Sequence, residues 1–142
     1  IFEKVLSENI KVVFFIPLVV YMADAVGTQT QSIYIRDLRT KKASFKKYLV
    51  KESLLGVILG ILTGVISGGI VMVWFGVTQL ALAVALGMIG AVASAPVIAL
   101  LVTEVLELEH TDPAVGAGPI ATVIQDTVSV LIYGYVASLV IL

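Results

Sequence analysis

Four apolar segments, each long enough to cross a lipid bilayer as a helix, dominate this sequence. They cover about residues 10–35, 53–75, 80–103 and 113–142, and a bilayer-spanning helix needs about 20 predominantly apolar residues. The chain is 59% hydrophobic and only 13% charged, whereas a soluble domain has about 25% charged residues. A chain of 142 residues has no interior large enough for this apolar surface, so lipid must surround it. We therefore predict an all-α integral membrane protein, with residues 1–142 forming one transmembrane domain of four helices.

The distribution of basic residues predicts how these helices are oriented. All nine Lys and Arg precede Glu52, and seven of them lie in the segment 36–51. Short loops rich in Lys and Arg stay on the cytoplasmic side of the membrane. We expect 36–51 to be a cytoplasmic loop and the C-terminus to lie outside, in a multi-pass protein of the cell membrane. Because the loop is short and flanked by membrane spans, topology explains it better than a nucleic-acid or phospholipid patch does, and we expect no nucleic-acid partner.

Small residues repeat at helical spacing in the two middle segments. In the second segment they are Gly56, Gly60, Gly64 and Gly68. In the third segment they are Gly87, Ala91, Ala95 and Ala99. A spacing of four residues places each set on one helical face, where another helix can approach closely. Pro96 lies in the middle of the third segment and predicts a kink, because it removes one backbone donor.

Two carboxylates, Asp24 and Asp126, lie inside the first and last apolar segments. On insertion scales an Asp at the bilayer centre costs roughly 2.5–3.5 kcal/mol, so such residues face a bundle interior or water and mark a pathway. Helical spacing places polar or small residues beside them, namely Gly27, Thr28, Gln31, Thr122 and Ser129. Carboxylate, hydroxyl and carbonyl oxygens suit Mg²⁺, Mn²⁺ or Ca²⁺. We therefore predict a divalent-cation path, with both aspartates as metal ligands.

Other interpretations of the two acids stay open at this point. Each aspartate is also compatible with a protonated group, a hydrogen bond between helices, or the coupling site of a proton- or Na⁺-coupled carrier. A membrane scaffold that oligomerises through the glycine face leaves both acids unexplained. An enzyme is not expected, because the sequence has no intramembrane Ser/His or His/Glu cluster of the kind that a membrane hydrolase needs.

The segment 112–119 contains two prolines and two glycines, which makes a regular helix unfavourable there. Broken backbone near an ion path can present carbonyl groups to the ion. The simpler interpretation is a loop that leads into a helix, with Asp112 as the N-cap residue, and we expect that role for Asp112.

These residues resemble the membrane domain of the MgtE family of magnesium transporters and channels. The similarity is strongest in Asp112-Pro113-Ala114 and in Gly118-Pro119, which are followed by Thr122 and Asp126. A second similar stretch is Ala-Asp-Ala-Val-Gly-Thr-Gln-Thr at 23–30, which matches the family's Gly-Gly-Asn-Thr-Gly-Asn-Gln at Gly27 and Gln29. There the chain departs from the family, because Ala23 and Asp24 replace its paired glycines and add a carboxylate.

The resemblance implies that Mg²⁺ is the transported ion. It also implies a homodimer with a channel-like pore along the dimer interface. It implies that Asp126 contributes to the ion site and that Ala23 lines the ion path. The family's membrane domain has five helices, and the four predicted here fit its last four. We therefore expect an upstream helix, or a cytoplasmic regulatory domain such as many members carry, outside this chain.

Overall fold

The computed structural model describes residues 10–141, and these residues contain helices and no strand. The helices are α2 (Ile10–Phe14), α3 (Ile16–Arg39), α4 (Phe45–Phe75), α5 (Thr78–Leu108) and α6 (Pro113–Ile141). Together, α2 and α3 form one of four candidate membrane spans, each of which is long and apolar enough to cross a bilayer. The prediction of an all-α membrane protein with four long apolar helices is therefore confirmed.

The break between α2 and α3 lies at Phe15. Pro17 in the first turn of α3 has no N–H to continue the backbone ladder, and its ring crowds the carbonyl group four residues earlier. The Phe15 N–H instead bonds to the Val12 carbonyl oxygen at 3.2 Å in a tighter turn. The first predicted span is therefore a helix with a short leading turn.

The helices extend beyond the apolar segments, so the predicted loop 36–51 is mostly helical. α3 continues to Arg39 and α4 begins at Phe45, which leaves residues 40–44 as the connection. Hydropathy marks where lipid ends, but Lys and Arg are good helix formers in the polar layer beyond it. For the same reason α5 runs over Thr78–Leu108, rather than over the predicted 80–103.

The expectation of irregular backbone at 112–119 is wrong, because α6 is helical from Pro113 onward and includes Pro119. Pro113 is the first residue of α6, where its missing N–H would have no partner. Pro119 lies inside the helix, and membrane helices tolerate proline there because neighbouring groups satisfy the freed backbone carbonyl. The N-cap role of Asp112 is confirmed, since its Oδ1 accepts the Ala114 N–H at 2.9 Å and its carbonyl oxygen accepts the Val115 N–H at 3.0 Å.

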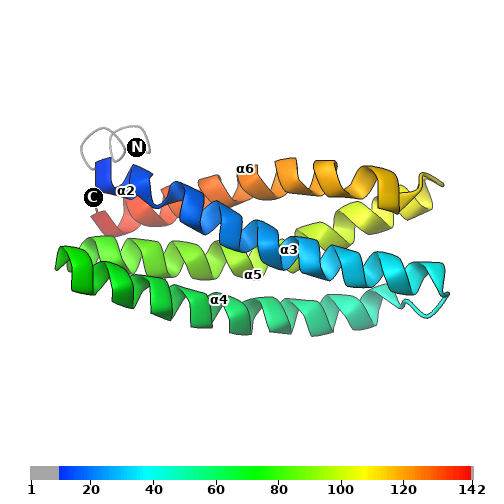
Figure 1. Ribbon diagram of the computed structural model, residues 1–142, viewed down its shortest axis with the longest axis horizontal. Coiled ribbons are helices and arrows are strands. Elements are labelled where there is room, and N and C mark those ends of the chain that lie inside the picture. The colour runs from blue at the N-terminus through cyan, green and yellow to red at the C-terminus, as the bar shows by residue number, and fades with distance from the viewer. Residues whose placement is uncertain (1–9, 142) are drawn as a thin grey trace.

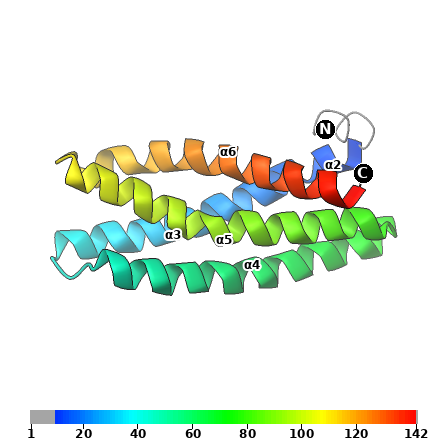
Figure 2. The ribbon, with the colours of Figure 1, turned by 180° about the vertical axis from the view of Figure 1, so that it is seen from behind.

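α5 is the central helix of the bundle (Figures 1 and 2). It packs against α3, α4 and α6, whereas α4 barely touches α3. The ribbon of α5 changes direction in mid-span (Figure 2), in the part of the helix that contains Pro96. The connections 40–44 and 109–112 lie at one end of the bundle, and the α4–α5 turn and α2 lie at the other (Figure 1). Gly76 makes that turn with a φ of 63°, a backbone conformation that glycine adopts without strain.

The glycine face of α4 lies against α5. A Cβ atom added to Gly64 would lie 2.7 Å from the Ala85 carbonyl oxygen, and one added to Gly60 would lie 2.9 Å from the Ile89 carbonyl oxygen. Gly56 and Gly68 meet α5 equally closely, at Pro96 and Ala85. Because these residues have no side chain, the backbones of α4 and α5 come close enough for van der Waals contact along this face. Such contact matters in a membrane, since lipid provides no hydrophobic effect to hold two helices together.

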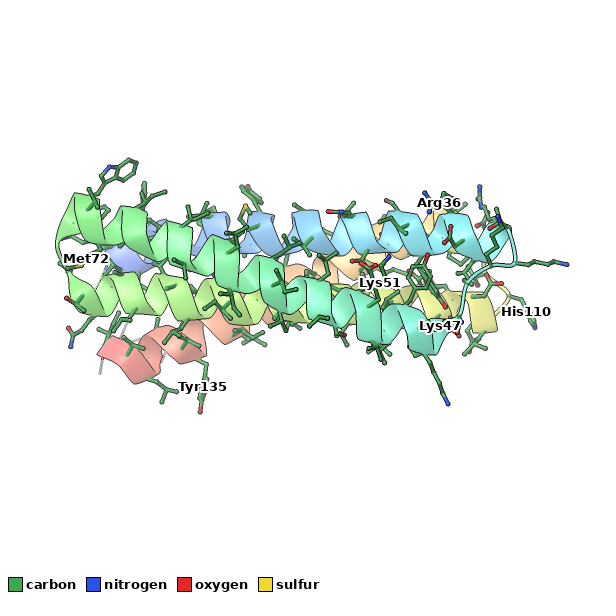
Figure 3. All side chains as sticks on the ribbon, turned by 90° about the horizontal axis from the view of Figure 1, so that it is seen from below. Arg36, Lys47, Lys51, Met72, His110 and Tyr135 are labelled. Carbon is green, nitrogen blue, oxygen red and sulfur yellow. The ribbon has the colours of Figure 1, made fainter. Side chains whose placement is uncertain are left out.

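Charged side chains gather at the end of the bundle that carries the 40–44 connection. Figure 3 shows Arg36, Lys47, Lys51 and His110 there, with Met72 at the opposite end. Between the two ends, α4 exposes a row of large aliphatic side chains, including Leu54, Ile58, Ile61, Leu62 and Val65. An exposed apolar surface of this extent is what a lipid-facing helix presents.

Candidate ion site

Asp24 of α3 and Thr122 of α6 meet in the middle of the bundle. The Thr122 hydroxyl donates a hydrogen bond to Asp24 Oδ1 at 3.0 Å, although the two residues are 98 positions apart in the sequence. Both residues are partly buried. α3 and α6 also pack directly on each other, so this hydrogen bond lies at a helix–helix contact rather than at a chance approach of surface side chains.

A small cavity of about 10 Å³ adjoins this hydrogen bond. Five of the predicted site residues line it, namely Asp24, Gly27, Thr28, Gln31 and Thr122. The rest of the lining comes from Ala95, Ile98 and Ala99 of α5 and from Ala121 and Gln125 of α6. A Cβ atom at Gly27 would lie 3.5 Å from the Ala95 carbonyl oxygen, so the small residue lets α3 lie close to α5 beside the cavity.

Asp126 lies one helical turn beyond Thr122 on α6 and is partly buried. Its Oδ1 is buried and has no hydrogen-bond partner among the described residues. Within the described part of the chain neither Asp24 nor Asp126 forms an ion pair with Lys, Arg or His. The two carboxyl groups therefore have no counter-ion among these residues.

Two predicted path residues lie deeper in the bundle than the others. Ala23 and Ser129 are completely buried, and neither lines the cavity beside Asp24. Ser129 Oγ instead accepts a hydrogen bond from Gln125 Nε2 at 3.0 Å. These two residues thus lie within the helix packing of a single chain.

Gln125 is a site residue that the sequence analysis missed. It is 3% exposed, lines the cavity, and its Nε2 also donates to the Ala91 carbonyl oxygen of α5 at 3.4 Å. The signal for it was present, because position 125 lies three residues after Thr122 and four before Ser129, on the same face of a helix.

A second group of polar contacts joins α3 to its neighbours nearer the 40–44 connection. The Thr30 hydroxyl donates to Glu52 Oε2 at 3.1 Å, and Glu52 is 1% exposed. The Tyr34 hydroxyl donates to Glu104 Oε2 at 2.6 Å, and the Tyr48 hydroxyl donates to Asp37. These contacts fix how α3 sits against α4 and α5 in the half of the bundle where α3 and α4 otherwise make little contact.

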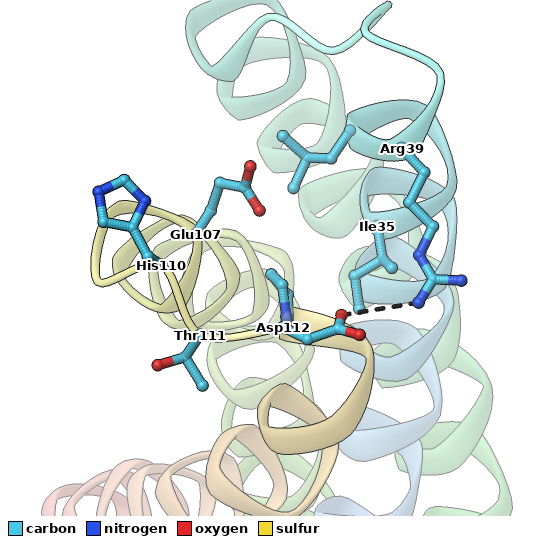
Figure 4. A pocket seen from close by; sticks show the side chains of 8 residues that line it. Ile35, Arg39, Glu107, His110, Thr111 and Asp112 are labelled. Carbon is cyan, nitrogen blue, oxygen red and sulfur yellow. Dashed lines mark ion pairs between the residues drawn. The ribbon is translucent and has the colours of Figure 1, made fainter.

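A larger cavity of about 370 Å³ lies at the charged end of the bundle. Figure 4 shows Arg39, Glu107, His110 and Asp112 around it, with Arg39 Nη2 3.6 Å from Asp112 Oδ1. The two charged groups of this pair are more than half exposed, so water screens their attraction and the pair adds little to stability.

The described residues of a single chain bring no larger cluster of metal-binding side chains to Asp24 and Asp126. Among residues 10–141 there is no group of three or more His, Cys, Asp or Glu side chains that could hold a metal ion. A cation at Asp24 and Asp126 therefore needs hydroxyl or carbonyl oxygens, water, or groups from elsewhere to complete its coordination shell.

Comparison with known proteins agrees with the resemblance noted in the sequence. The profile of the MgtE family, described as divalent cation transporters, matches residues 16–136. The magnesium transporter MgtE of Enterococcus faecalis is 30% identical over 97% of this chain, and its counterpart in Bacillus subtilis is 26% identical over 96%. The MgtE of Thermus thermophilus is 26% identical over 97% of this chain, and the chain spans 31% of the length of each of the three relatives. With most of its length matched by the family profile, this chain belongs to the MgtE family, whose members are transporters rather than enzymes.

Proposed function

We propose that this chain forms the ion-conducting part of a divalent-cation transporter and that Mg²⁺ is the ion transported. The observation that carries the proposal is the contact between Asp24 and Thr122, in a bundle whose exposed α4 face is aliphatic. A carboxyl group inside a membrane is energetically costly, and such groups usually mark an ion or substrate pathway. Family membership supports the same ion class, since the profile is that of divalent cation transporters.

Mg²⁺ binds through its water shell in this proposal. The ion gives up water reluctantly and usually keeps several water ligands in protein sites. Asp24 and Asp126 therefore attract a hydrated ion electrostatically, while Thr28 and Thr122 bond to its water ligands. With the 40–44 connection in the cytoplasm and the C-terminus outside, the membrane potential drives the ion inward. The gain is about 4.6 kcal/mol per divalent ion at 100 mV, enough for channel-like flow without a second energy source.

We propose that the pore lies between two copies of this chain. Polar residues exposed to the outside of the bundle occur within the spans of α3 and α6, including Thr28, Gln29, Ser32 and Thr127. The exposed face of α4 is aliphatic and suits lipid. A two-fold axis beside α3 and α6 brings four carboxylates around one path and supplies the ligands that a single chain lacks. In this arrangement the four helices are the last four of a five-helix domain.

The experiment that tests the proposal measures Mg²⁺ uptake into proteoliposomes with an internal fluorescent indicator. Asp24→Asn and Asp126→Asn each keep the size of the side chain and remove its charge, and each should lower uptake at least tenfold. Asp112→Asn is the matched control, because Asn caps a helix as well as Asp does and position 112 lies outside the membrane span. Uptake at the wild-type rate in both Asp24→Asn and Asp126→Asn would refute the proposal.

A carrier that couples the cation to protons or Na⁺ is the alternative, and one observation favours it. Asp126 Oδ1 is buried without a hydrogen-bond partner among the described residues, and such a carboxyl group is a natural proton-binding site. Uptake measured with and without an imposed pH or Na⁺ gradient distinguishes the two. Uptake that depends only on the Mg²⁺ gradient and the membrane potential excludes coupling.

A further inference from the structure

Two buried amide groups with unpartnered atoms line the cavity beside Asp24. Gln31 is 5% exposed and Gln125 is 3% exposed, and both line the cavity. Gln125 Nε2 donates to Ser129 and to the Ala91 carbonyl oxygen. Among residues 10–141, however, Gln125 Oε1 has no hydrogen-bond partner, and neither has Gln31 Nε2. The cavity therefore has one unpaired acceptor, on α6, and one unpaired donor, on α3.

The size of the cavity matches a single water molecule. Its volume is about 10 Å³, close to the smallest volume that holds one water, and a buried water typically makes about three hydrogen bonds. A water here accepts a bond from Gln31 Nε2 and donates one bond to Gln125 Oε1. Its remaining hydrogen can be donated to the Asp24 carboxylate, which lines the same cavity.

We propose that one ordered water bridges Gln31, Gln125 and Asp24, and that the two glutamines are positioning residues for the Asp24 carboxylate. A cation does not fit this place, because the amide hydrogens of Gln31 present positive charge and a hydrated divalent ion is far larger than the cavity. The transported ion therefore approaches Asp24 from outside the cavity.

The water completes a polar network that joins three helices around Asp24. Thr122 donates to Asp24 Oδ1 and the water binds the same carboxylate from the cavity side. Gln125 is itself fixed by Ser129 of α6 and by the backbone of α5 at Ala91. The Thr122 hydroxyl and the water together hold the Asp24 carboxylate in one orientation. The carboxylate is therefore already oriented when an ion arrives. This consequence rests on the proposed role of Asp24 in ion binding, whereas the presence of the water does not.

The first test measures how Mg²⁺ uptake depends on Mg²⁺ concentration, because this dependence distinguishes a role in positioning Asp24 from a role in folding. Gln125→Leu and Gln31→Leu remove the amide at similar size, and each should raise the Mg²⁺ concentration for half-maximal uptake about three- to tenfold, as expected for one lost hydrogen bond. The maximal rate should stay within about twofold of wild type. Gln79→Leu, at an exposed position near the start of α5, is the matched control and should change neither quantity. A wild-type concentration dependence in both cavity variants would overturn the positioning role.

The second test observes the water directly and does not depend on transport. A high-resolution density map of the full-length protein in chelator should show one peak in contact with Gln31, Gln125 and Asp24, and the peak should be absent from Gln125→Leu. With Mn²⁺ in place of Mg²⁺ the cavity should give no anomalous signal. An anomalous peak inside the cavity, or a cavity without density in the wild type, would refute the presence of the bridging water. If the peak is present while Asp24→Asn and Asp126→Asn both transport at the wild-type rate, the proposed function fails and the water assignment stands.

Discussion

Replacing Gly64 by Ala should destabilise the protein measurably, although alanine is the better helix former. The added Cβ atom would lie 2.7 Å from the Ala85 carbonyl oxygen and 2.6 Å from Ile89 Cγ1, whereas ordinary contact begins at about 3.4 Å. The Ile89 side chain can rotate, but the carbonyl oxygen of Ala85 is part of the α5 backbone. α4 must therefore move away from α5 by about 0.7 Å at this point, the difference between 3.4 and 2.7 Å.

The magnitude follows from two opposing contributions to the free energy of unfolding. Overpacking of a close contact costs typically about 1–3 kcal/mol, and the higher helix propensity of alanine returns at most about 1 kcal/mol. Because the Ala85 carbonyl oxygen is backbone and cannot rotate away, the cost should lie in the upper part of that range, at about 2–3 kcal/mol. After the helix-propensity gain, the net loss for Gly64→Ala is about 1–2 kcal/mol, and Gly60→Ala should lose a similar amount. Gly69→Ala is the matched control, since a Cβ atom there would have no atom of the described residues 10–141 within 4 Å. This variant should be as stable as the wild type or slightly more so.

The assay is thermal unfolding of the purified protein in detergent, followed by tryptophan fluorescence. A loss of 1–2 kcal/mol corresponds to a decrease of about 3–8 °C in Tm for a chain of this size. Each variant should be compared with Gly69→Ala in the same detergent, so that solubilisation affects all samples equally. If Gly64→Ala and Gly69→Ala have the same Tm, the close backbone approach of α4 and α5 is not what the glycine face provides.

Two further predictions concern hydrogen bonds at the charged end of the bundle. Thr30→Val keeps the shape of the side chain but removes the donor to the buried Glu52 carboxylate, so it should lower the free energy of unfolding by about 1–3 kcal/mol. The control Thr127→Val, at an exposed position of α6, should leave Tm within about 1 °C of wild type. Equal Tm values for both variants would contradict a role for the Thr30–Glu52 bond. Asp112→Ala removes the oxygen that accepts the Ala114 N–H and should lower the free energy of unfolding by about 1 kcal/mol, whereas Asp112→Asn should not. Chemical denaturation measures both variants. A loss of equal size in the two would assign the effect to charge rather than to capping.

Much of the fold follows from residues that are close together in the sequence. The four apolar segments predicted four helices because, in lipid, only a helix or a closed barrel satisfies every backbone N–H and C=O group. The helix ends were predicted less well, since α3 continues to Arg39 and α4 begins at Phe45, where polar sequence masks a continuing helix. Hydropathy reports the edge of the lipid, whereas the backbone hydrogen-bond ladder continues past it.

The sequence alone determined which helices carry acids, where the glycines recur and that Asp112 caps α6. Only the tertiary structure decided that Asp24 meets Thr122 across 98 positions, that Ser129 lies fully buried and that Gln125 belongs to the site. The physical reason is that a periodic pattern defines the faces of one helix, but the rotation and depth of each helix are set by its packing against neighbours. Here that packing is set by α5, whose small residues let α3 and α6 come close enough for their polar faces to form one site.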